Sequence, residues 1–194
     1  MEFAKTIDSI ELNLLPLKAF SGRIHLISNF EDYFRVIPEL MRVRAFGFDT
    51  ETKPSFKKGV SNTVSLLQLG TKNDVYLFRL NDIGLPKEIC DIFENPAVIK
   101  VGAAIHDDIK SLKGLSDFNQ AGFVDLQDVV RKLEFECFSL KKLTAIFLGF
   151  RISKSQQLSN WESEILTPQQ QVYAATDAWV SLLVHLEILR NQEN

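Results

Sequence analysis

Four acidic residues lie inside or at the end of apolar stretches, where an ionised side chain is costly to bury. Asp49 and Glu51 close the apolar run AFGFDTE, and Asp108 interrupts the segment VGAAIHDDIKSL. Asp177 is the sole acid in the fifteen-residue apolar stretch from Val172 to Leu186. Each carboxylate therefore needs a cation, a hydrogen-bond partner or a proton.

Divalent metal is the simplest partner for these acids, because the same segments contain almost no lysine or arginine. Carboxylate oxygens suit hard cations such as Mg²⁺ and Mn²⁺. Two such ions can clamp a phosphate, one activating water and the other stabilising the leaving oxygen. The acids therefore indicate hydrolysis of a phosphodiester with two Mg²⁺ or Mn²⁺ ions.

The first two acids are two residues apart in an expected strand, so their side chains leave the same face. Neighbouring carboxylates repel each other and raise each other's proton affinity unless a dication lies between them. A strand end that reaches solvent would carry the same D-T-E sequence, and so short a signal recurs by chance in many chains. Taken alone, Asp49 and Glu51 favour the solvent-exposed strand end.

Helical spacing separates Asp108 from its neighbour Asp107. Asp108 falls in the same stripe as Ile105 and Leu112, at intervals of three and four residues. It is therefore expected on the core-facing side of a helix, where it needs a partner. Asp107 is expected to be a solvated surface charge.

Tyr173 and Asp177 are four residues apart and share a face of the last expected helix. That helix is apolar on all sides, which is typical of a helix buried in the middle of a domain. A buried tyrosine is most often a core aromatic residue with a satisfied hydroxyl. Because no basic residue lies within a turn of Asp177, the shared face makes Tyr173 a candidate site residue.

The elements that must position these residues form an early group of strands followed by alternating strands and helices. Strands are expected at 23–28, 45–51, 63–70, 75–80 and 98–102, with a T-K-N-D hairpin between the third and fourth. Helices are expected at 29–43, 86–93, 105–115, 127–133, 139–148 and from 168 onward, after the cap at Thr167. This order predicts an α/β fold in which helices cover both faces of a mixed sheet.

The composition is that of an ordinary globular domain, 45% apolar and 24% charged over 194 residues. Residues 1–22 are expected to form an N-terminal arm, and 23–194 the domain that carries the acids. We expect no bilayer-spanning run, no secretory signal and two reduced cysteines, hence a cytoplasmic protein. The net charge of −3 does not exclude nucleic acid, because metal-bound carboxylates would leave the remainder slightly basic.

Three motifs occur in the order found in a known enzyme family. F-D-x-E, VG-x-x-I-x-x-D and Y-x-x-x-D resemble the DEDD superfamily of 3′→5′ exonucleases, whose tyrosine branch includes ribonuclease D and the Werner-type exonuclease domain. The segments VSLLQLGTKNDVYLF, KVGAAIHDD and LSNWESEILTPQQQVYAATDAW are similar to the Werner-type domain. The similarity runs from about Ile24 to Leu189. Val172 stands where the histidine branch has its histidine, so the tyrosine branch is the match.

The resemblance implies that 23–194 is a 3′-5′ exonuclease domain with a ribonuclease-H-like fold, a mixed five-stranded sheet flanked by helices. It further implies that the substrate is the 3′ end of a nucleic acid. This is expected to be single-stranded or recessed DNA, with RNA as the alternative. A reference pKa near ~10 makes the tyrosine an orienter of water rather than a strong base. The implied ligands of two Mg²⁺ or Mn²⁺ ions are Asp49, Glu51, Asp108 and Asp177. The residue implied to hold the attacking water is Tyr173.

Residues that follow the first motif are candidates for substrate contact. Thr52 and Lys53 are expected to meet the terminal nucleotide. Phe56, Lys57 and Lys58 are expected to meet the strand, because lysine beside an aromatic residue is typical of single-strand binding. A solvated turn explains each of these residues equally well.

The segment before the last helix is expected to close over the site through Arg151, Lys154 and Trp161. Packing in the core is an equal alternative for Trp161. Lys141 and Lys142 are interpreted most simply as a solvated helix face.

Three other functions fit parts of the sequence. His106, Asp108 and His185 imitate the ligand triad of non-haem iron, but the helical period places His106 off the face of Asp108 and the other acids stay unexplained. A catalytically inactive nucleic-acid-binding module would not need every acid and the tyrosine. An RNA 3′-end-processing enzyme of the ribonuclease D type has the same chemistry and stays open. Because the chain ends soon after the last helix, we expect a stand-alone trimming enzyme without an accessory helical domain.

Overall fold

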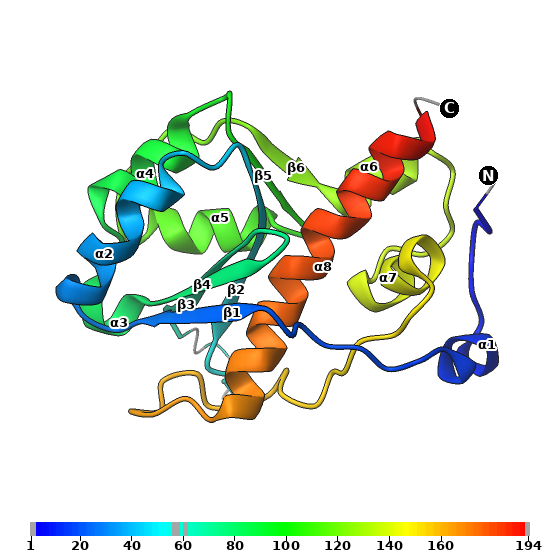
Figure 1. The fold of residues 1–194 in the computed structure, drawn as a ribbon, viewed down its shortest axis with the longest axis horizontal. Coiled ribbons are helices and arrows are strands. Elements are labelled where there is room, and N and C mark those ends of the chain that lie inside the picture. The colour runs from blue at the N-terminus through cyan, green and yellow to red at the C-terminus, as the bar shows by residue number, and fades with distance from the viewer. Residues whose placement is uncertain (1–2, 56–58, 60–61, 193–194) are drawn as a thin grey trace.

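A mixed sheet crossed by one long helix forms the centre of the computed structural model, which describes residues 3–55, 59 and 62–192 (Figure 1). Within these residues the sheet has six strands in the order β1-β4-β3-β2-β5-β6. The strands are β1 (Arg23–Ile27), β2 (Ala45–Thr52), β3 (Val64–Gly70), β4 (Asp74–Arg79), β5 (Ile99–Gly102) and β6 (Phe123–Asp125). The helices are α1 (Ser9–Leu14), α2 (Phe30–Leu40), α3 (Leu80–Ile83), α4 (Lys87–Glu94), α5 (His106–Lys113), α6 (Leu126–Lys132), α7 (Leu140–Leu148) and α8 (Pro168–Gln192).

The expected mixed sheet with helices on both faces is confirmed, but it has six strands where five were expected. The additional strand is β6, which pairs in parallel with β5 over three residues. This strand was not expected, because three residues are too few to show an alternating pattern and the segment leads directly into α6. β3 runs antiparallel to both β2 and β4, which confirms the expected hairpin, and β5 runs parallel to β2.

Helices α2, α4 and α5 cover one face of the sheet, and the aromatic side chains of β2 pack beneath them. Phe46 and Phe48 are fully buried in this core. The ring of Phe48 meets the ring of Phe93 from α4 edge-on, with the centroids 5.9 Å apart. Because side chains alternate along a strand, Asp49 and Glu51 point to the opposite face.

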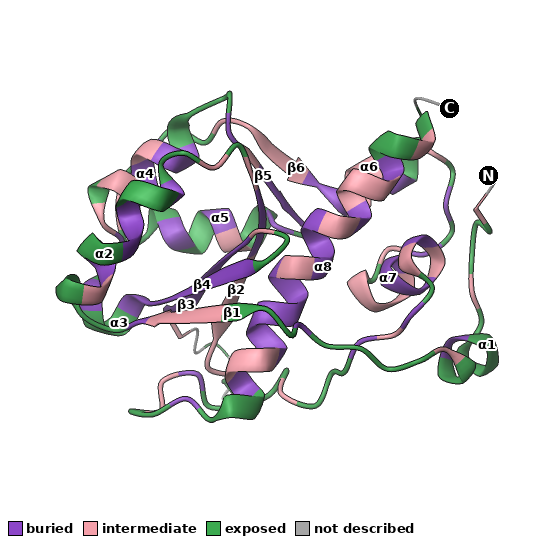
Figure 2. Cartoon of the chain, viewed as in Figure 1, coloured by how far each residue is buried: buried purple, intermediate pink, exposed green. Residues whose placement is uncertain are grey.

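Helix α8 covers that opposite face and is buried along most of its length (Figure 2). It begins with the expected capping box, in which the Thr167 hydroxyl accepts the Gln170 N–H at 3.2 Å and the Gln170 side chain accepts the Thr167 N–H at 3.0 Å. By length and composition α8 could cross a membrane, contrary to the expectation that no such run exists. However, 61% of the apolar 18-residue stretch within α8 is buried inside the protein. This is the environment of a central core helix.

The close approach of α8 to β2 depends on Gly47. A Cβ atom at this position would lie 1.7 Å from the carbonyl oxygen of Ala178, which is far inside the contact limit. Ala178 directly follows Asp177 in α8. The missing side chain at position 47 therefore lets α8 carry Asp177 up to the strand that holds Asp49.

Gly47→Ala should separate α8 from β2. We expect the free energy of unfolding to fall by about 1–3 kcal/mol, the usual cost of overpacking a core, as measured by urea denaturation. Gly70→Ala is the matched control, because its added carbon would lie 3.1 Å from the backbone nitrogen of Trp179 and needs a smaller adjustment. Equal stability of Gly47→Ala and the wild-type protein would contradict this account of the helix–strand contact.

The N-terminal residues pack along the rest of the molecule. Leu17 pairs with Arg151 in an isolated bridge, and the Phe20 N–H donates a hydrogen bond of 2.9 Å to the hydroxyl of Thr176 in α8. In Figure 1 the blue N-terminal segment, which includes the short helix α1, runs past α7 toward β1. The boundary between an arm of residues 1–22 and the domain stays a prediction.

Candidate metal centre

Three carboxylates from two elements meet beside the second half of β2. Oxygen atoms of Asp49, Glu51 and Asp177 all lie within 4.8 Å of one another. Asp49 and Glu51 project from one face of β2, and α8 brings Asp177 to that face. The expectation that the two strand acids act together is therefore supported by a third acid that is distant in sequence.

Burial is the main cause of a raised pKa in all three carboxyl groups. It raises the pKa of Glu51 to about 10, with added repulsion from Asp49 and Asp177. The pKa of Asp49 is raised well above its usual range by burial and then by the charge of Asp177. Burial raises the pKa of Asp177 to about 7, although a hydrogen bond from Tyr173 and the charge of Lys154 act in the opposite direction.

This arrangement fits a divalent cation. Three close carboxylates cannot all be ionised near neutral pH without a positive charge between them. Among the residues that the structure describes, no lysine or arginine forms an ion pair with any of the three. Carboxylate oxygens are the ligands that Mg²⁺ and Mn²⁺ prefer. A divalent ion is thus the partner that the donor set lacks.

Asp108 lies near the three carboxylates without joining their group. It is in the first turn of α5, on the other side of the sheet, and accepts a hydrogen bond from the hydroxyl of Thr50. Its negative charge helps to raise the pKa of both Asp49 and Glu51. The expected difference from its neighbour is confirmed, because Asp107 is exposed and Asp108 is partly buried. Its role as a fourth metal ligand stays a prediction.

Asp125, which the sequence did not single out, fixes the start of α5. Its carboxylate accepts the backbone N–H groups of Ala104 and Ile105, each at 3.0 Å, and that of Gln127 at 2.8 Å. One buried side chain at the end of β6 therefore holds the first residues of both α5 and α6. The available signal was an acid closing a short apolar segment, as at Asp49, but sequence does not reveal which backbone groups such an acid will meet.

Tyr173 lies beside the carboxylates and is 9% exposed. Burial and the charge of Asp177 raise the pKa of its hydroxyl, so this group stays protonated and acts as a hydrogen-bond donor. The ring packs against Trp161, with the centroids 6.0 Å apart. Because Trp161 is completely buried, the prediction that it contacts substrate is wrong, and the packing alternative holds.

A cavity of about 370 Å³ opens beside the three carboxylates. Its lining includes Ser139 and Lys141 at the start of α7, and Lys154 in the segment between α7 and α8. Lys154 was expected to close over the site, and the structure places it there. Lys141 was interpreted as part of a solvated helix face, whereas it is partly buried in this wall. The sequence does not show that α7 begins at the cavity.

The residues predicted to touch substrate after β2 have different outcomes. Thr52 is partly exposed at the end of β2, beyond a register shift in its pairing with β3. The amine of Lys53 lies 2.8 Å from a carboxylate oxygen of Glu162 and is therefore already paired. Phe56 and Lys57, together with Lys58, lie outside the described residues. Substrate contact by Thr52 and Lys53 stays a prediction.

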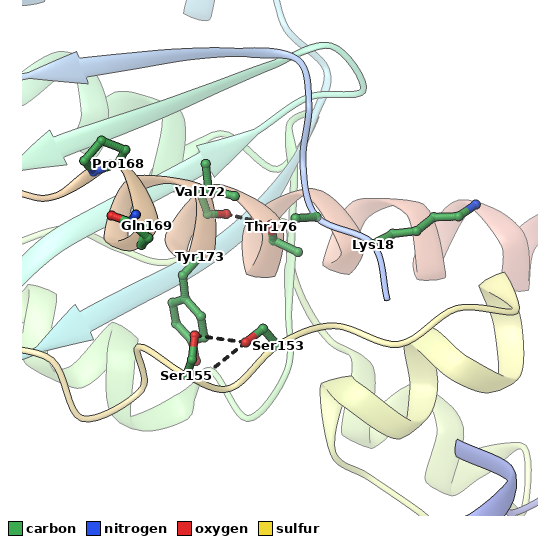
Figure 3. Close-up of a pocket in the computed structure, with 9 residues that line it drawn as sticks. Lys18, Ser153, Ser155, Pro168, Gln169, Val172, Tyr173 and Thr176 are labelled. Atoms are coloured by element: carbon green, nitrogen blue, oxygen red, sulfur yellow. Dashed lines mark hydrogen bonds between the residues drawn. The ribbon is translucent and has the colours of Figure 1, made fainter. Parts of the chain in front are cut away.

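A second cavity, of about 350 Å³, shares Tyr173 and Ser153 with the first. Figure 3 shows the Tyr173 ring pointing from α8 toward Ser153 and Ser155. The Ser153 hydroxyl accepts the Ser155 N–H at 3.1 Å and lies 3.0 Å from the Ser155 hydroxyl. The turn thus contributes Ser153 to both cavities. Ser155 lines the second cavity, whereas Lys154 lines the first.

A second set of possible ligands, formed by His106, Asp125 and Asp128, is better explained by local structure. The His106 side chain is 75% exposed and lies 3.5 Å from Asp128. The carboxylate of Asp125 is already used by three backbone N–H groups. The iron-triad alternative receives no support, because within the described residues His106 is grouped with these two aspartates and not with Asp108 or His185.

Comparison with known proteins agrees with this geometry. The sequence profile of a 3′-5′ exonuclease family matches residues 24–192. The chain is 30% identical over 194 residues to the exonuclease mut-7 homolog of Aedes aegypti, covering 87% of this chain and 27% of that protein. It is 33% identical over 148 residues to the bifunctional 3′-5′ exonuclease/ATP-dependent helicase WRN of Mus musculus, covering 73% of this chain and 11% of that protein. It thus spans much less than half the length of these relatives.

A solved structure gives the same result for the fold. The crystal structure of the Aedes aegypti Nibbler EXO domain superposes with a TM-score of 0.79 at 25% identity, covering 91% of this chain and 93% of that one. The sheet and its flanking helices are therefore those of a known exonuclease domain. With a profile match over most of its length and three carboxylates gathered on this fold, the chain belongs to the 3′-5′ exonuclease family.

Proposed function

We propose that this chain is a metal-dependent exonuclease that removes nucleotides one at a time from the 3′ end of DNA or RNA. The observation that carries the proposal is the set of three carboxylates with oxygens within 4.8 Å of one another and without a basic partner among the described residues. The cavity beside them, of about 370 Å³, has the size of a small-ligand site. Such a cavity suits a single-stranded or recessed 3′ end.

Each site residue has a role that follows from its place. Asp49, Glu51 and Asp177 would hold the metal, and Asp108 would complete the set from α5. Two Mg²⁺ or Mn²⁺ ions, when bound, would supply activation of water and stabilisation of the leaving oxygen. The chain's own contribution is to hold the carboxyl groups of Asp49, Glu51 and Asp177 within 4.8 Å of one another beside β2 before substrate arrives.

Tyr173 would orient the attacking water. Its hydroxyl stays protonated because its pKa is raised, so it can donate a hydrogen bond but cannot serve as a base near neutral pH. In the reaction, a water oxygen forms a bond to phosphorus while the bond from phosphorus to the 3′-oxygen breaks. A proton lost by the water passes through solvent to the leaving oxygen. The products are a nucleoside 5′-monophosphate and a strand shortened by one nucleotide with a new 3′-hydroxyl.

Digestion of 5′-labelled DNA and RNA oligonucleotides of one sequence, with Mg²⁺, Mn²⁺ or a chelator, tests the proposal. We expect a ladder that shortens from the 3′ end and disappears with chelator. Comparing the two sugars separates a DNA exonuclease from an RNA-processing enzyme of the ribonuclease D type. The absence of products with either metal and either strand would instead indicate a catalytically inactive nucleic-acid-binding module.

A further inference from the structure

The cavity beside the carboxylates has walls of opposite charge. One wall carries Asp49, Glu51 and Asp177, whereas Lys141 and Lys154 line the other. The two lysines come from separate segments, the first turn of α7 and the turn after β-bridge residue Arg151. Metal on the acidic wall would leave the basic wall facing whatever anion that metal attracts.

Lys154 is directed toward the carboxylates by the turn that carries it. The Ser155 N–H and the Ser153 hydroxyl close this turn, with donor and acceptor 3.1 Å apart. Lys154, between these two serines, lines the cavity that contains Asp177. Its charge is close enough to lower the pKa of Asp177, yet the two groups form no ion pair.

The amines of Lys154 and Lys141 are free to bind a ligand. In the described part of the chain neither amine makes a hydrogen bond, an ion pair or a contact with an aromatic ring. Lys53, in contrast, is paired with Glu162 at 2.8 Å. Among the described lysines, Lys141 and Lys154 thus line the cavity without a hydrogen bond or ion pair, whereas Lys53 is paired.

We propose that Lys154 is a catalytic residue that contacts the phosphate being hydrolysed, and that Lys141 binds the adjacent phosphate of the strand. This inference rests on the proposed exonuclease function. An ammonium group offers three donors and a compact charge, which suits the extra negative charge that develops on phosphate oxygens during the reaction. Lys141 lies at the start of a nine-residue helix, where backbone N–H groups also favour an anion.

The two lysines should have different kinetic effects. Removal of a donor to developing charge usually lowers kcat by about 10²–10³-fold, so Lys154→Met should lower kcat with little change in KM. Lys141→Met should raise KM with little change in kcat. It should also reduce the slope of log affinity against log salt by about 0.7, the contribution of one phosphate contact to a single strand.

The test is steady-state digestion of a 5′-labelled single strand by the wild-type protein, Lys154→Met, Lys154→Arg, Lys141→Met and Lys142→Met. Lys142 is the matched control, because it is next to Lys141 but does not line the cavity. Lys154 is exposed, so its replacement should leave the thermal unfolding midpoint unchanged. Lys154→Arg should recover much of the lost kcat, because it restores the charge.

A second substrate identifies the phosphate. A neutral methylphosphonate at the linkage next to the scissile one should raise KM for the wild-type protein but not further for Lys141→Met. An active wild-type protein whose Lys154 and Lys141 variants match Lys142→Met would overturn this inference and leave the exonuclease function intact. Failure of Lys154→Arg to recover activity would also overturn it. A wild-type protein without activity would refute the proposed function itself.

Discussion

Asp49→Asn should lower the rate of 3′-end digestion by about 10⁴-fold or more, as is typical when one member of a group that acts as a unit is removed. Asparagine keeps the shape of the side chain but removes the negative charge that, in the proposed site, would hold metal. Asp49 interacts electrostatically with the other acids, since burial, Asp177 and Asp108 all raise its pKa. Initial rates on a 5′-labelled oligonucleotide with saturating Mg²⁺ or Mn²⁺ measure the effect.

Two comparisons make this prediction specific to metal binding. Tyr173→Phe should retain measurable activity, with a loss of about 10²-fold, because orientation of a proton-bearing group contributes less than the metal. Asp107→Asn should behave like the wild-type protein, because Asp107 is exposed beside the partly buried Asp108. Equal losses in Asp49→Asn and Tyr173→Phe would contradict the division of roles between ligand and orienter.

Local periodicity was sufficient to predict how several of the acidic side chains are oriented. The two-residue period of a strand placed Asp49 and Glu51 on one face, and the helical stripe distinguished Asp108 from Asp107. The order of the strands and helices likewise predicted a sheet with helices on both faces. These inferences succeed because a side chain's direction within one element depends only on neighbouring residues.

The basic wall could not be predicted in the same way. Lys141 is a surface residue by its helical pattern, and it joins the cavity only because α7 begins opposite β2. Trp161 follows a polar, irregular segment, and its complete burial depends on contact with Tyr173 from α8. The contacts of Asp125 depend on the relative positions of β6, α5 and α6. The surroundings of Lys141, Trp161 and Asp125 therefore all depend on the packing of elements that are distant in sequence.

The metal-free protein should lose stability as the pH rises from about 5 to about 8. The pKa of Asp177 is about 7 and that of Glu51 about 10 in the folded state, far above the values near ~4 of unfolded chains. In this pH range the folded state therefore binds more protons than the unfolded state, so the free energy of unfolding falls as pH rises. The stability from protonated Asp177 is fully present below about pH 4 and is lost as the pH rises through about 7.

Divalent metal should reverse this loss, and more strongly at pH 8 than at pH 5, because ligand carboxylates must release protons before they bind metal. Metal at about 100 times its dissociation constant adds ~2.7 kcal/mol, which raises the melting temperature of a chain of this length by roughly 5–10 °C. Thermal unfolding at several pH values, with chelator and with Mn²⁺ or Mg²⁺, measures both effects.

Asp49→Asn separates this explanation from a general effect of pH or salt. Removal of one repelling carboxylate should make the metal-free variant more stable than the wild-type protein at pH 8, while stabilisation by metal is largely lost. Asp107→Asn should keep the wild-type profile in both conditions. Metal-free stability that stays level or rises from pH 5 to 8 would contradict the raised pKa values, and equal stabilisation by metal at both pH values would place its binding site away from these carboxylates. If the metal-free site lowers the stability of the protein and metal restores it, the acids are positioned to bind metal even though this position destabilises the metal-free protein.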